Sequence, residues 1–391
     1  MKILMVNNQL SILGGSETYM LSIGEELSLR GNEVQYFGKK DTNNNCFNEY
    51  GIYAKPSKNP FSIIKNTKNV KSFIKLIDLY KPDIIHIHLV YFTITPQIIV
   101  EAHKRGIPVI QTVHDSKIVC CNHRLFIPHK TEPCLKCLNN GFGECVTNKC
   151  IKNSLFLSFL AKKESEHYKK RGVYNLISKF IFPSEFMQNI HVESGIDKSR
   201  TIVLNNFSRI QKASFVDKTK FDNKYVLYFG RVSVEKGMHT LKKIVESMPT
   251  IRFVIVGTGN LLEVFKHYEN CELVGFKEKD ELIEYVKNAT ISLFPSVWYE
   301  NCPMSILESI ALGTPVVGSK IGGIPELIEE GTTGFVVEPS NYNGFVEKIN
   351  DIFWNDKLLI EMSNNCLKRS RITDVKEYVD KLENIYKEFL R

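Results

Sequence analysis

Short apolar runs alternate along the chain with stretches whose apolar positions repeat every three to four residues. The runs predict buried strands, and the repeats predict amphipathic helices. In the first half of the chain, the predicted strands cover residues 3–6, 34–37, 83–88, 109–113, 179–182 and 201–204. Helices are expected between them, including a basic helix over 62–80 and another helix over 155–171. This alternation predicts a parallel sheet with helices on both faces.

A second series of the same kind begins at residue 225. Its predicted strands cover residues 225–230, 253–256, 272–274, 291–294 and 315–318, with helices between them. The stretch 208–224 is polar and without periodicity, so we interpret it as a linker. Residues 373–391 carry an apolar position every three or four residues and predict a final amphipathic helix. The chain is therefore expected to form two doubly wound α/β domains that face a cleft, 1–207 and 208–372.

The alternation is interrupted over 116–152, where six of the ten cysteines lie. The spacing Cys-x2-Cys at Cys134 and Cys137 is typical of zinc ligands when two further ligands complete the set. The candidate set for a structural zinc is Cys121, Cys134, Cys137 and Cys150, with His123 and His129 as spare ligands. The alternative is an insertion whose thiols bind no metal. Structural disulfides are not expected in a chain that stays in the cytoplasm.

Length and composition limit the class of protein. With 391 residues, 43% hydrophobic and 24% charged, the chain is long enough for two domains and is not disordered. It contains no run of about 18 apolar residues, so no transmembrane helix is expected. The start, MKILMVNNQL, resembles a buried strand more than a signal peptide, and we expect a cytoplasmic protein.

Charge is distributed unevenly. Residues 1–180 hold 25 Lys and Arg against 14 Asp and Glu, whereas residues 181–391 hold 26 against 29. A basic first half suggests an anionic partner, such as lipid headgroups, a lipid diphosphate or nucleic acid. Basic apolar segments at 55–75 and 149–171 are typical of helices that lie on an anionic membrane, although a core helix with a wet face has the same pattern.

Two glycine-rich turns directly follow predicted strands. Gly14 and Gly15 open a helix after the first strand, where free N–H groups can receive an anion, although a plain turn also accepts two glycines. Gly230–Gly237 follows the first strand of the second domain and contains Arg231 and Lys236. At the carboxyl edge of a doubly wound sheet these two cations can neutralise a diphosphate.

Two glutamates bracket the start of a predicted helix. Glu300 precedes it and Glu308 lies inside it, and eight residues are a little over two helical turns. One carboxylate can bind sugar hydroxyls and the other a ribose diol. Taken alone, this spacing is better explained by a surface helix with two incidental glutamates.

The stretch 299–328, YENCPMSILESIALGTPVVGSKIGGIPELI, resembles the retaining glycosyltransferases of family 4, which have the GT-B fold. Further family patterns occur in the family's order: GG-x-E at 14–17, T-x-H-D at 112–115, G-R-x4-K-G at 230–237, E-x7-E at 300–308, G-x-P-V-V at 313–317 and GG-x-x-E at 322–326. Asn206 resembles the Asn of the family's V-x-x-N-G, with Phe207 in place of Gly. The resemblance covers nearly the whole chain.

The resemblance implies a role for each matched residue. Arg231 and Lys236 would bind the donor diphosphate, and Glu308 the ribose. Glu300, with the backbone near Asn301, Cys302 and Met304, would bind the transferred sugar. From the first domain, Gly15 would lie under the diphosphate and His114 would point to the sugar. The catalytic set is thus expected to be Glu300, His114, Arg231 and Lys236. Many relatives carry Gly-Phe-Gly where this chain has Asn301-Cys302-Pro303, and Pro303 removes one backbone donor near the sugar.

The resemblance also implies the architecture and the reaction. The first domain would bind the acceptor and the second a UDP- or GDP-linked sugar, and helix 373–391 would pack back on the first domain. Transfer would retain the anomeric configuration without a catalytic metal, since no Asp-x-Asp motif is present. The product would be a surface polysaccharide such as lipopolysaccharide or capsule, built by a cytoplasmic enzyme that can bind the inner face of the membrane. No nucleic-acid partner is expected.

Three other classes remain open. A nucleotide-sugar epimerase can use the same fold, and a non-catalytic protein could bind the same donor. An NAD-dependent enzyme is less consistent with the sequence, because Leu262 stands where the third glycine of a G-x-G-x-x-G motif should follow Gly257 and Gly259.

Overall fold

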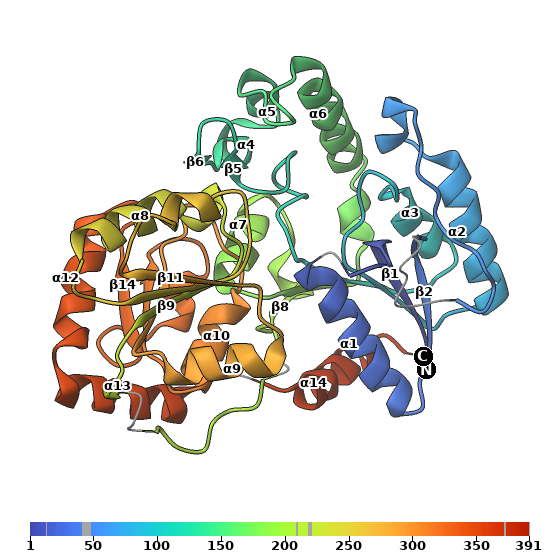
Figure 1. Cartoon of the computed structure of the whole chain (residues 1–391). Coiled ribbons are helices and arrows are strands. Elements are labelled where there is room, and N and C mark those ends of the chain that lie inside the picture. Colours follow the sequence, from blue (N-terminus) through green and yellow to red (C-terminus); the bar gives the residue numbers. More distant parts are fainter. Residues whose placement is uncertain (13, 41–47, 209, 218–220, 371–372, 391) are drawn as a thin grey trace. The chain divides into compact units, whose positions relative to one another are not determined.

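The computed structural model describes the chain except for residues 13, 41–47, 209, 218–220, 371–372 and 391. Two compact units result (Figure 1). Unit 1 comprises Met1–His129, Cys134–Asn205 and Val375–Arg391, and unit 2 comprises Lys130–Pro133 and Asn206–Asp374. Parts of the predicted linker and residue 372, the predicted end of the second domain, lie outside the described residues.

Unit 1 is built on a parallel six-stranded sheet. Its strands are β1 (Lys2–Gln9), β2 (Glu33–Lys39), β3 (Ile84–Ile87), β4 (Val109–Thr112), β7 (Lys179–Phe182) and β8 (Thr201–Val203), in the order β2-β1-β3-β4-β7-β8. The helices between them are α1 (Gly15–Leu29), α2 (Thr67–Tyr80), α3 (Gln97–Lys104), α6 (Leu155–Lys170) and α7 (Glu185–Glu193), with short 3-10 turns η1 (Pro60–Ile63), η2 (Val173–Leu176) and η3 (Lys198–Arg200). The strand order reverses between β1 and β3, which is where doubly wound sheets bind ligands.

Unit 2 repeats the plan with a second parallel sheet. Its strands are β9 (Val226–Phe229), β10 (Phe253–Val256), β11 (Cys271–Gly275), β12 (Ile291–Phe294), β13 (Val316–Ser319) and β14 (Gly334–Val337), in the order β11-β10-β9-β12-β13-β14. The helices are α8 (Met238–Ser247), α9 (Lys279–Asn288), α10 (Met304–Ala311), α11 (Ile324–Leu327), α12 (Tyr342–Phe353) and α13 (Asp356–Arg369), with turns η5 (Val234–Lys236) and η6 (Leu262–Phe265). Here the order reverses between β9 and β12.

Alternating residues of the second sheet explain its two helical layers. Val226 and Tyr228 belong to one buried cluster with residues of α8, α12 and α13. Leu227 and Phe229 belong to another with residues of α9, α10 and α11. Successive side chains of a strand point to opposite faces, so strand β9 contacts a helical layer on each side. Because both of its faces are buried, strand β9 is apolar throughout. The prediction of two doubly wound α/β domains is confirmed.

The C-terminal helix α14 (Val375–Lys387) belongs to unit 1 and packs on α1 (Figure 1). Its buried stripe includes Tyr378, Leu382 and Tyr386. The Arg30 guanidinium lies 2.5 Å from a carboxylate oxygen of Asp380. This amphipathic helix therefore completes the apolar surface of α1.

Three stretches differ from the sequence prediction. Strand β14, the sixth of the second sheet, is not among the predicted strands. The helix predicted over 62–80 is divided into η1 and α2, because the side chain of Asn66 accepts a hydrogen bond from the N–H of Asn69 and begins a new helix. The insertion 116–152 holds two short helices, α4 (Lys136–Asn140) and α5 (Gly143–Thr147), and the two-residue strands β5 (Phe126–Ile127) and β6 (Glu132–Pro133).

Candidate functional site

The main cavity of unit 2 lies at the point where its strand order reverses. The loops that follow β9 and β12 form one wall, and the start of α10 forms another. The cavity has a volume of about 290 Å³. It is lined by Tyr228, Phe229, Gly230, Arg231, Lys236, Phe294, Ser296, Glu300, Pro303, Met304, Ser305, Glu308 and Ile324. Five of the sequence-predicted site residues therefore line one cavity: Arg231, Lys236, Glu300, Met304 and Glu308.

Lys236 and Glu300 form an ion pair in this cavity. The Lys236 Nζ lies 2.6 Å from Oε1 of Glu300, and the Ser296 hydroxyl donates to the same oxygen at 2.8 Å. Burial works to raise the pKa of Glu300, but the charge and hydrogen bond of Lys236 outweigh it and hold this pKa below its usual value. Glu300 is therefore an ionised carboxylate that can accept hydrogen bonds from hydroxyl groups.

Arg231 and Lys236 share an aromatic neighbour. The Arg231 guanidinium carbon lies 6.0 Å and the Lys236 Nζ 5.5 Å from the ring centroid of Trp298. Arg231 is 64% exposed and lies 3.4 Å from a carboxylate oxygen of Glu235. The aromatic face attracts both cations and keeps them near each other, where an anionic ligand can bind them together.

Glu308 lies on α10, and its environment differs from that of Glu300. Burial raises the pKa of Glu308 to about 7, although the hydroxyl of Ser208 donates to its Oε1 at 3.2 Å and opposes the rise. Glu308 therefore titrates near neutral pH. Ser208 lies in the predicted linker, and no sequence signal marks it as a site residue.

Two glycines allow the loops around Glu300 to lie close together. Gly237 has a φ of +79°, and a Cβ there would overlap the carbonyl oxygen of Pro295. Gly322 has a φ of +60°, and a Cβ there would overlap the backbone of Glu300. Residues with a Cβ atom are strained at such φ values, and a Cβ atom has no room at these two positions. The glycines of two sequence motifs therefore position Lys236 and Glu300.

The stretch between the two glutamates only partly follows the prediction. Pro303 precedes the first residue of α10, and Met304 and Ser305 line the cavity. Asn301 and Cys302 are absent from its lining. Cys302 is buried, and its carbonyl oxygen accepts a hydrogen bond from Asn206 at 3.1 Å. Ser305 was not predicted.

A second cavity of about 250 Å³ shares residues 229–231 with the first. It is further lined by Val256, Gly257, Thr258, Phe276, Lys277 and Leu282, and the Phe276 side chain is 73% exposed. A Cβ on Gly257 would overlap the carbonyl oxygen of Gly230, so this glycine allows the two loops to meet. In the sequence, Gly257 counts only against an NAD site, and no motif predicts this second cavity.

The two predicted site residues of unit 1 follow β1 and β4, which lie on either side of β3 in the first sheet. Gly15 is exposed at the first position of α1, and no atom lies within 4 Å of where its Cβ would be. His114 follows β4, and its Nε2 lies 3.0 Å from Nδ1 of His88, which follows β3. Burial lowers the pKa of His114 to about 3, so its imidazole is neutral at physiological pH.

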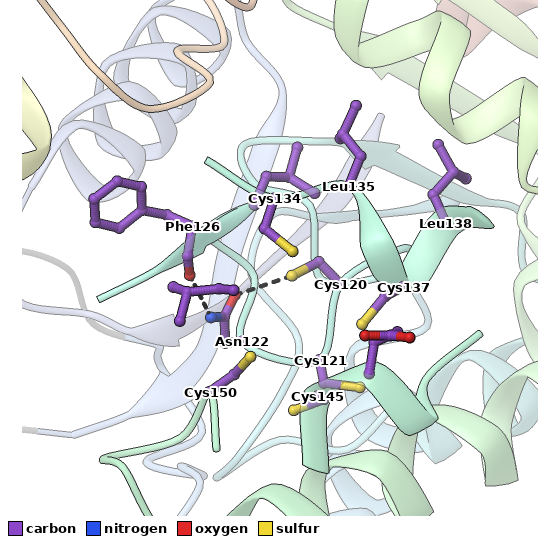
Figure 2. A pocket seen from close by; sticks show the side chains of 13 residues that line it. Cys120, Cys121, Asn122, Phe126, Cys134, Leu135, Cys137, Leu138, Cys145 and Cys150 are labelled. Atoms are coloured by element: carbon purple, nitrogen blue, oxygen red, sulfur yellow. Dashed lines mark hydrogen bonds between the residues drawn. The ribbon is translucent and has the colours of Figure 1, made fainter. Parts of the chain in front are cut away.

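The cysteines of the insertion surround a small cavity of about 10 Å³ (Figure 2). A volume of this size holds roughly one water molecule and no organic ligand. The Cys120 thiol donates to Oδ1 of Asn122, whose amide group donates to the carbonyl of Phe126. Hydrogen bonds from the Cys137 and Cys145 thiols lower the pKa of Cys121.

The predicted zinc ligands are not arranged as a ligand set. Within the described ranges, no three His, Cys, Asp or Glu side chains are placed to hold a metal ion. The Cys121 thiol is hydrogen-bonded by Cys137, which belongs to the predicted set, and by Cys145, which does not. Zinc binding therefore stays a prediction that needs a metal analysis.

No helix in the described part of the chain has the length and apolarity needed to cross a bilayer.

Two family patterns match the chain. The pattern described as Glycosyltransferase Family 4 covers residues 13–210, and the pattern described as Glycosyl transferases group 1 covers residues 210–371. An uncharacterised glycosyltransferase of Methanocaldococcus jannaschii is 26% identical over 359 residues, which are 84% of this chain and 83% of that protein.

One further relative and one solved structure of similar fold have more informative descriptions. A UDP-Gal:alpha-D-GlcNAc-diphosphoundecaprenol alpha-1,3-galactosyltransferase of Escherichia coli is 25% identical over 343 residues, which are 83% of this chain and 80% of that protein. The crystal structure of the Anabaena protein HepE in complex with UDP covers 99% of this chain and 100% of its own, with a TM-score of 0.70 and 17% identity. The fold is therefore GT-B, and the chain belongs to glycosyltransferase family 4.

Proposed function

We propose that this chain transfers a sugar from a UDP- or GDP-linked donor to a glycan or lipid-linked acceptor, with retention of the anomeric configuration. The observation that carries the proposal is the cavity in which Arg231, Lys236, Glu300 and Glu308 converge. Two cations suit a diphosphate, and two carboxylates suit hydroxyl groups.

The donor is proposed to occupy both cavities of unit 2. The diphosphate would bind Arg231 and Lys236, the ribose Glu308, and the sugar Glu300. The nucleobase would enter the second cavity, whose lining includes the exposed ring of Phe276 and the backbone at Gly257. The Lys236 ammonium has three donor hydrogens, so it can bind a phosphate oxygen while it keeps its hydrogen bond to Glu300.

The chemical step that we propose is a front-face displacement. The acceptor hydroxyl attacks the anomeric carbon from the side on which the diphosphate leaves, and its proton passes to the departing phosphate oxygen. Negative charge grows on the diphosphate as the bond breaks, and Arg231 and Lys236 stabilise that charge. With these cations in place, we propose that the reaction needs no metal ion. His114 is neutral, so it would contribute a hydrogen bond rather than a proton.

The acceptor is proposed to be lipid-linked and presented at an anionic membrane. The name of the Escherichia coli relative specifies a diphosphoundecaprenol-linked sugar, which is a lipid-linked acceptor of this kind. In unit 1, the first turns of α6 expose Leu155, Phe156 and Phe159, at 56%, 54% and 45%. Phe61 of η1, which packs on α6, is 56% exposed.

Basic residues adjoin these apolar side chains. The Lys163 Nζ lies 5.3 Å from the ring centroid of Phe159. Six further lysines are exposed in the segment that leads into η1 and continues through α2: Lys55, Lys58, Lys65, Lys68, Lys71 and Lys75. Apolar side chains rimmed by cations are typical of surfaces that bind anionic lipid.

Nucleotide release from a panel of UDP- and GDP-sugars tests the transfer, with and without lipid-linked acceptors. Release that depends on acceptor and is lost in Lys236→Ala supports the proposal. Conversion of a donor to its epimer without acceptor would identify the alternative, an epimerase. Near wild-type transfer by both Lys236→Ala and Arg231→Ala would reject the proposed site.

Co-sedimentation with vesicles tests the membrane surface separately. The wild type is expected to bind phosphatidylglycerol vesicles and not phosphatidylcholine vesicles, and Phe156→Ser with Phe159→Ser should reduce that binding. The matched control is Phe215→Ser, since Phe215 of unit 2 is also exposed, at 65%. Equal binding by both variants would reject the surface.

A further inference from the structure

Two histidines meet directly at the carboxyl edge of the first sheet. His88 follows β3, is 1% exposed, and places its Nδ1 3.0 Å from Nε2 of His114. Their rings are stacked, with centroids 5.3 Å apart and an interplanar angle of 22°. Tyr19 of α1 contacts both rings edge-on, with its centroid 5.7 Å from that of His88 and 4.8 Å from that of His114. The two imidazoles are therefore held in one fixed relation.

Only one proton can lie between the two nitrogens. Burial lowers the pKa of His114 to about 3 and that of His88 well below its usual value, so both rings are neutral at physiological pH. A neutral imidazole carries one N–H and one lone pair. One ring must therefore donate through its proton, and the other must accept.

The other nitrogen of His88 decides which ring donates. His88 Nε2 is buried and has no hydrogen-bond partner among the described residues. A proton on Nε2 would be an orphaned buried donor, which is rarer in proteins than an unpaired acceptor. His88 therefore keeps its proton on Nδ1 and donates to His114.

A second buried histidine of the chain shows the same arrangement. His191 of α7 has its Nδ1 2.8 Å from the carbonyl oxygen of Met187, and its Nε2 is also buried without a partner in the described residues. A carbonyl can only accept, so His191 must carry its proton on Nδ1 and leave the Nε2 lone pair unpaired. The fold thus already tolerates the state deduced for His88.

We propose that His88 is a positioning residue that fixes the tautomer of His114: His114 accepts at Nε2 and so carries its own proton on Nδ1. His114 is only half-buried, and this places an N–H donor, rather than a lone pair, on the nitrogen that does not face His88. If His114 faces the transferred sugar, as the proposed function requires, that donor would bind an oxygen of the sugar. The tautomer itself does not depend on the proposed function.

Histidine-selective ¹⁵N–¹H NMR of the full-length protein without donor tests the tautomer. His191 supplies an internal reference for the Nδ1–H form. We expect His114 to show the same pattern as His191, with its proton on Nδ1. A signal for His114 with the proton on Nε2 would overturn the proposal, and this result needs no variant.

Two variants at one position test the positioning role. In His88→Asn the new amide nitrogen can donate near the original Nδ1, so this variant should keep His114 in the Nδ1–H form and keep transfer within a few-fold of wild type. His88→Leu removes the donor, so the two tautomers of His114 should mix and kcat should fall by about tenfold, the effect of one lost hydrogen bond. Equal kcat and unchanged NMR signals in His88→Leu would overturn the proposal. If His88→Leu changes the tautomer of His114 and leaves kcat unchanged, the claim that His88 fixes the tautomer stands, and the role of His114 in transfer is rejected.

Discussion

The ammonium of Lys236 lies 2.6 Å from the carboxylate of Glu300, and both groups line the main cavity of unit 2. Their side chains are only 22% and 8% exposed. Each charge therefore depends on the other to offset the loss of water, and both belong to sequence motifs that lie 64 residues apart.

Removing the cation alone should destabilise the fold. Lys236→Ala leaves the Glu300 carboxylate buried without its counter-charge, and we expect the free energy of unfolding to fall by about 2–4 kcal/mol. The double variant Lys236→Ala with Glu300→Gln removes both charges and should recover most of that loss in urea unfolding. It should not recover transfer, because the diphosphate cation is still missing. Recovery of both stability and transfer would show that the pair is purely structural.

Trp298 should report ligand binding and contribute to it. Trp298→Leu removes the ring under Arg231 and Lys236, and we expect the nucleotide diphosphate to bind about three- to tenfold more weakly. In the variant Trp354→Phe, all tryptophan fluorescence comes from Trp298, since the chain has two tryptophans. Nucleotide should change that fluorescence. Trp354 is 60% exposed between α12 and α13, so Trp354→Leu is the matched control and should leave affinity unchanged.

Glu308 should make stability depend on pH. Its pKa is raised from 4.5 to about 7 in the folded chain, so the folded state holds the proton more tightly than the unfolded state. The stability that this group contributes is fully present below pH 4.5 and is lost as the pH rises to about 7. Glu308→Gln should therefore gain on the order of 1–2 kcal/mol relative to wild type between pH 4.5 and pH 8. Thermal unfolding of both proteins across this pH range measures the difference in stability. If the stability of the two proteins changes with pH in the same way, the prediction is contradicted.

Gly237 should tolerate no side chain. Gly237→Ala combines a positive φ with overlap against the carbonyl of Pro295, and we expect a loss of about 3 kcal/mol or more. Gly331 is the matched control, because its φ of +70° is similar but nothing lies within 4 Å of its Cβ position. Gly331→Ala should cost only about 1–2 kcal/mol, the strain of the backbone alone. Equal losses in the two variants would show that the close approach to Pro295 is unimportant.

The sequence predicted the strands better than the contacts of the site. Apolar runs such as Ile291–Phe294 are buried on both faces, and their hydrophobicity alone marks them as strands. The motifs also predicted that Arg231, Lys236, Glu300 and Glu308 belong to one site, and all four line one cavity. Each lies in a loop that follows a strand, or in helix α10, at the same edge of the sheet.

Contacts that cross between distant segments could not be predicted. Ser208 lies in a polar stretch without periodicity, yet its hydroxyl bonds to Glu308, 100 residues away. The neighbours of Cys121 depend on how the insertion folds: the Cys137 and Cys145 thiols hydrogen-bond to it, and no spacing in the sequence marks Cys145 as a neighbour. His88 and His114 meet because β3 and β4 are adjacent, which strand order alone reveals.

The most direct test of the proposed site is an equilibrium titration of UDP and GDP into the purified full-length chain and three variants. We predict that one of the nucleotides binds the wild type, and that Arg231→Ala and Lys236→Ala each weaken it by about tenfold or more, since each removes a charge-assisted contact to phosphate. Lys320→Ala is the control, because Lys320 is 59% exposed, pairs with Glu338 and lies outside the cavity lining. It should bind as tightly as wild type. Binding that is equally tight in all three variants, or no binding of either nucleotide to the wild type, would contradict a nucleotide-sugar site in this cavity.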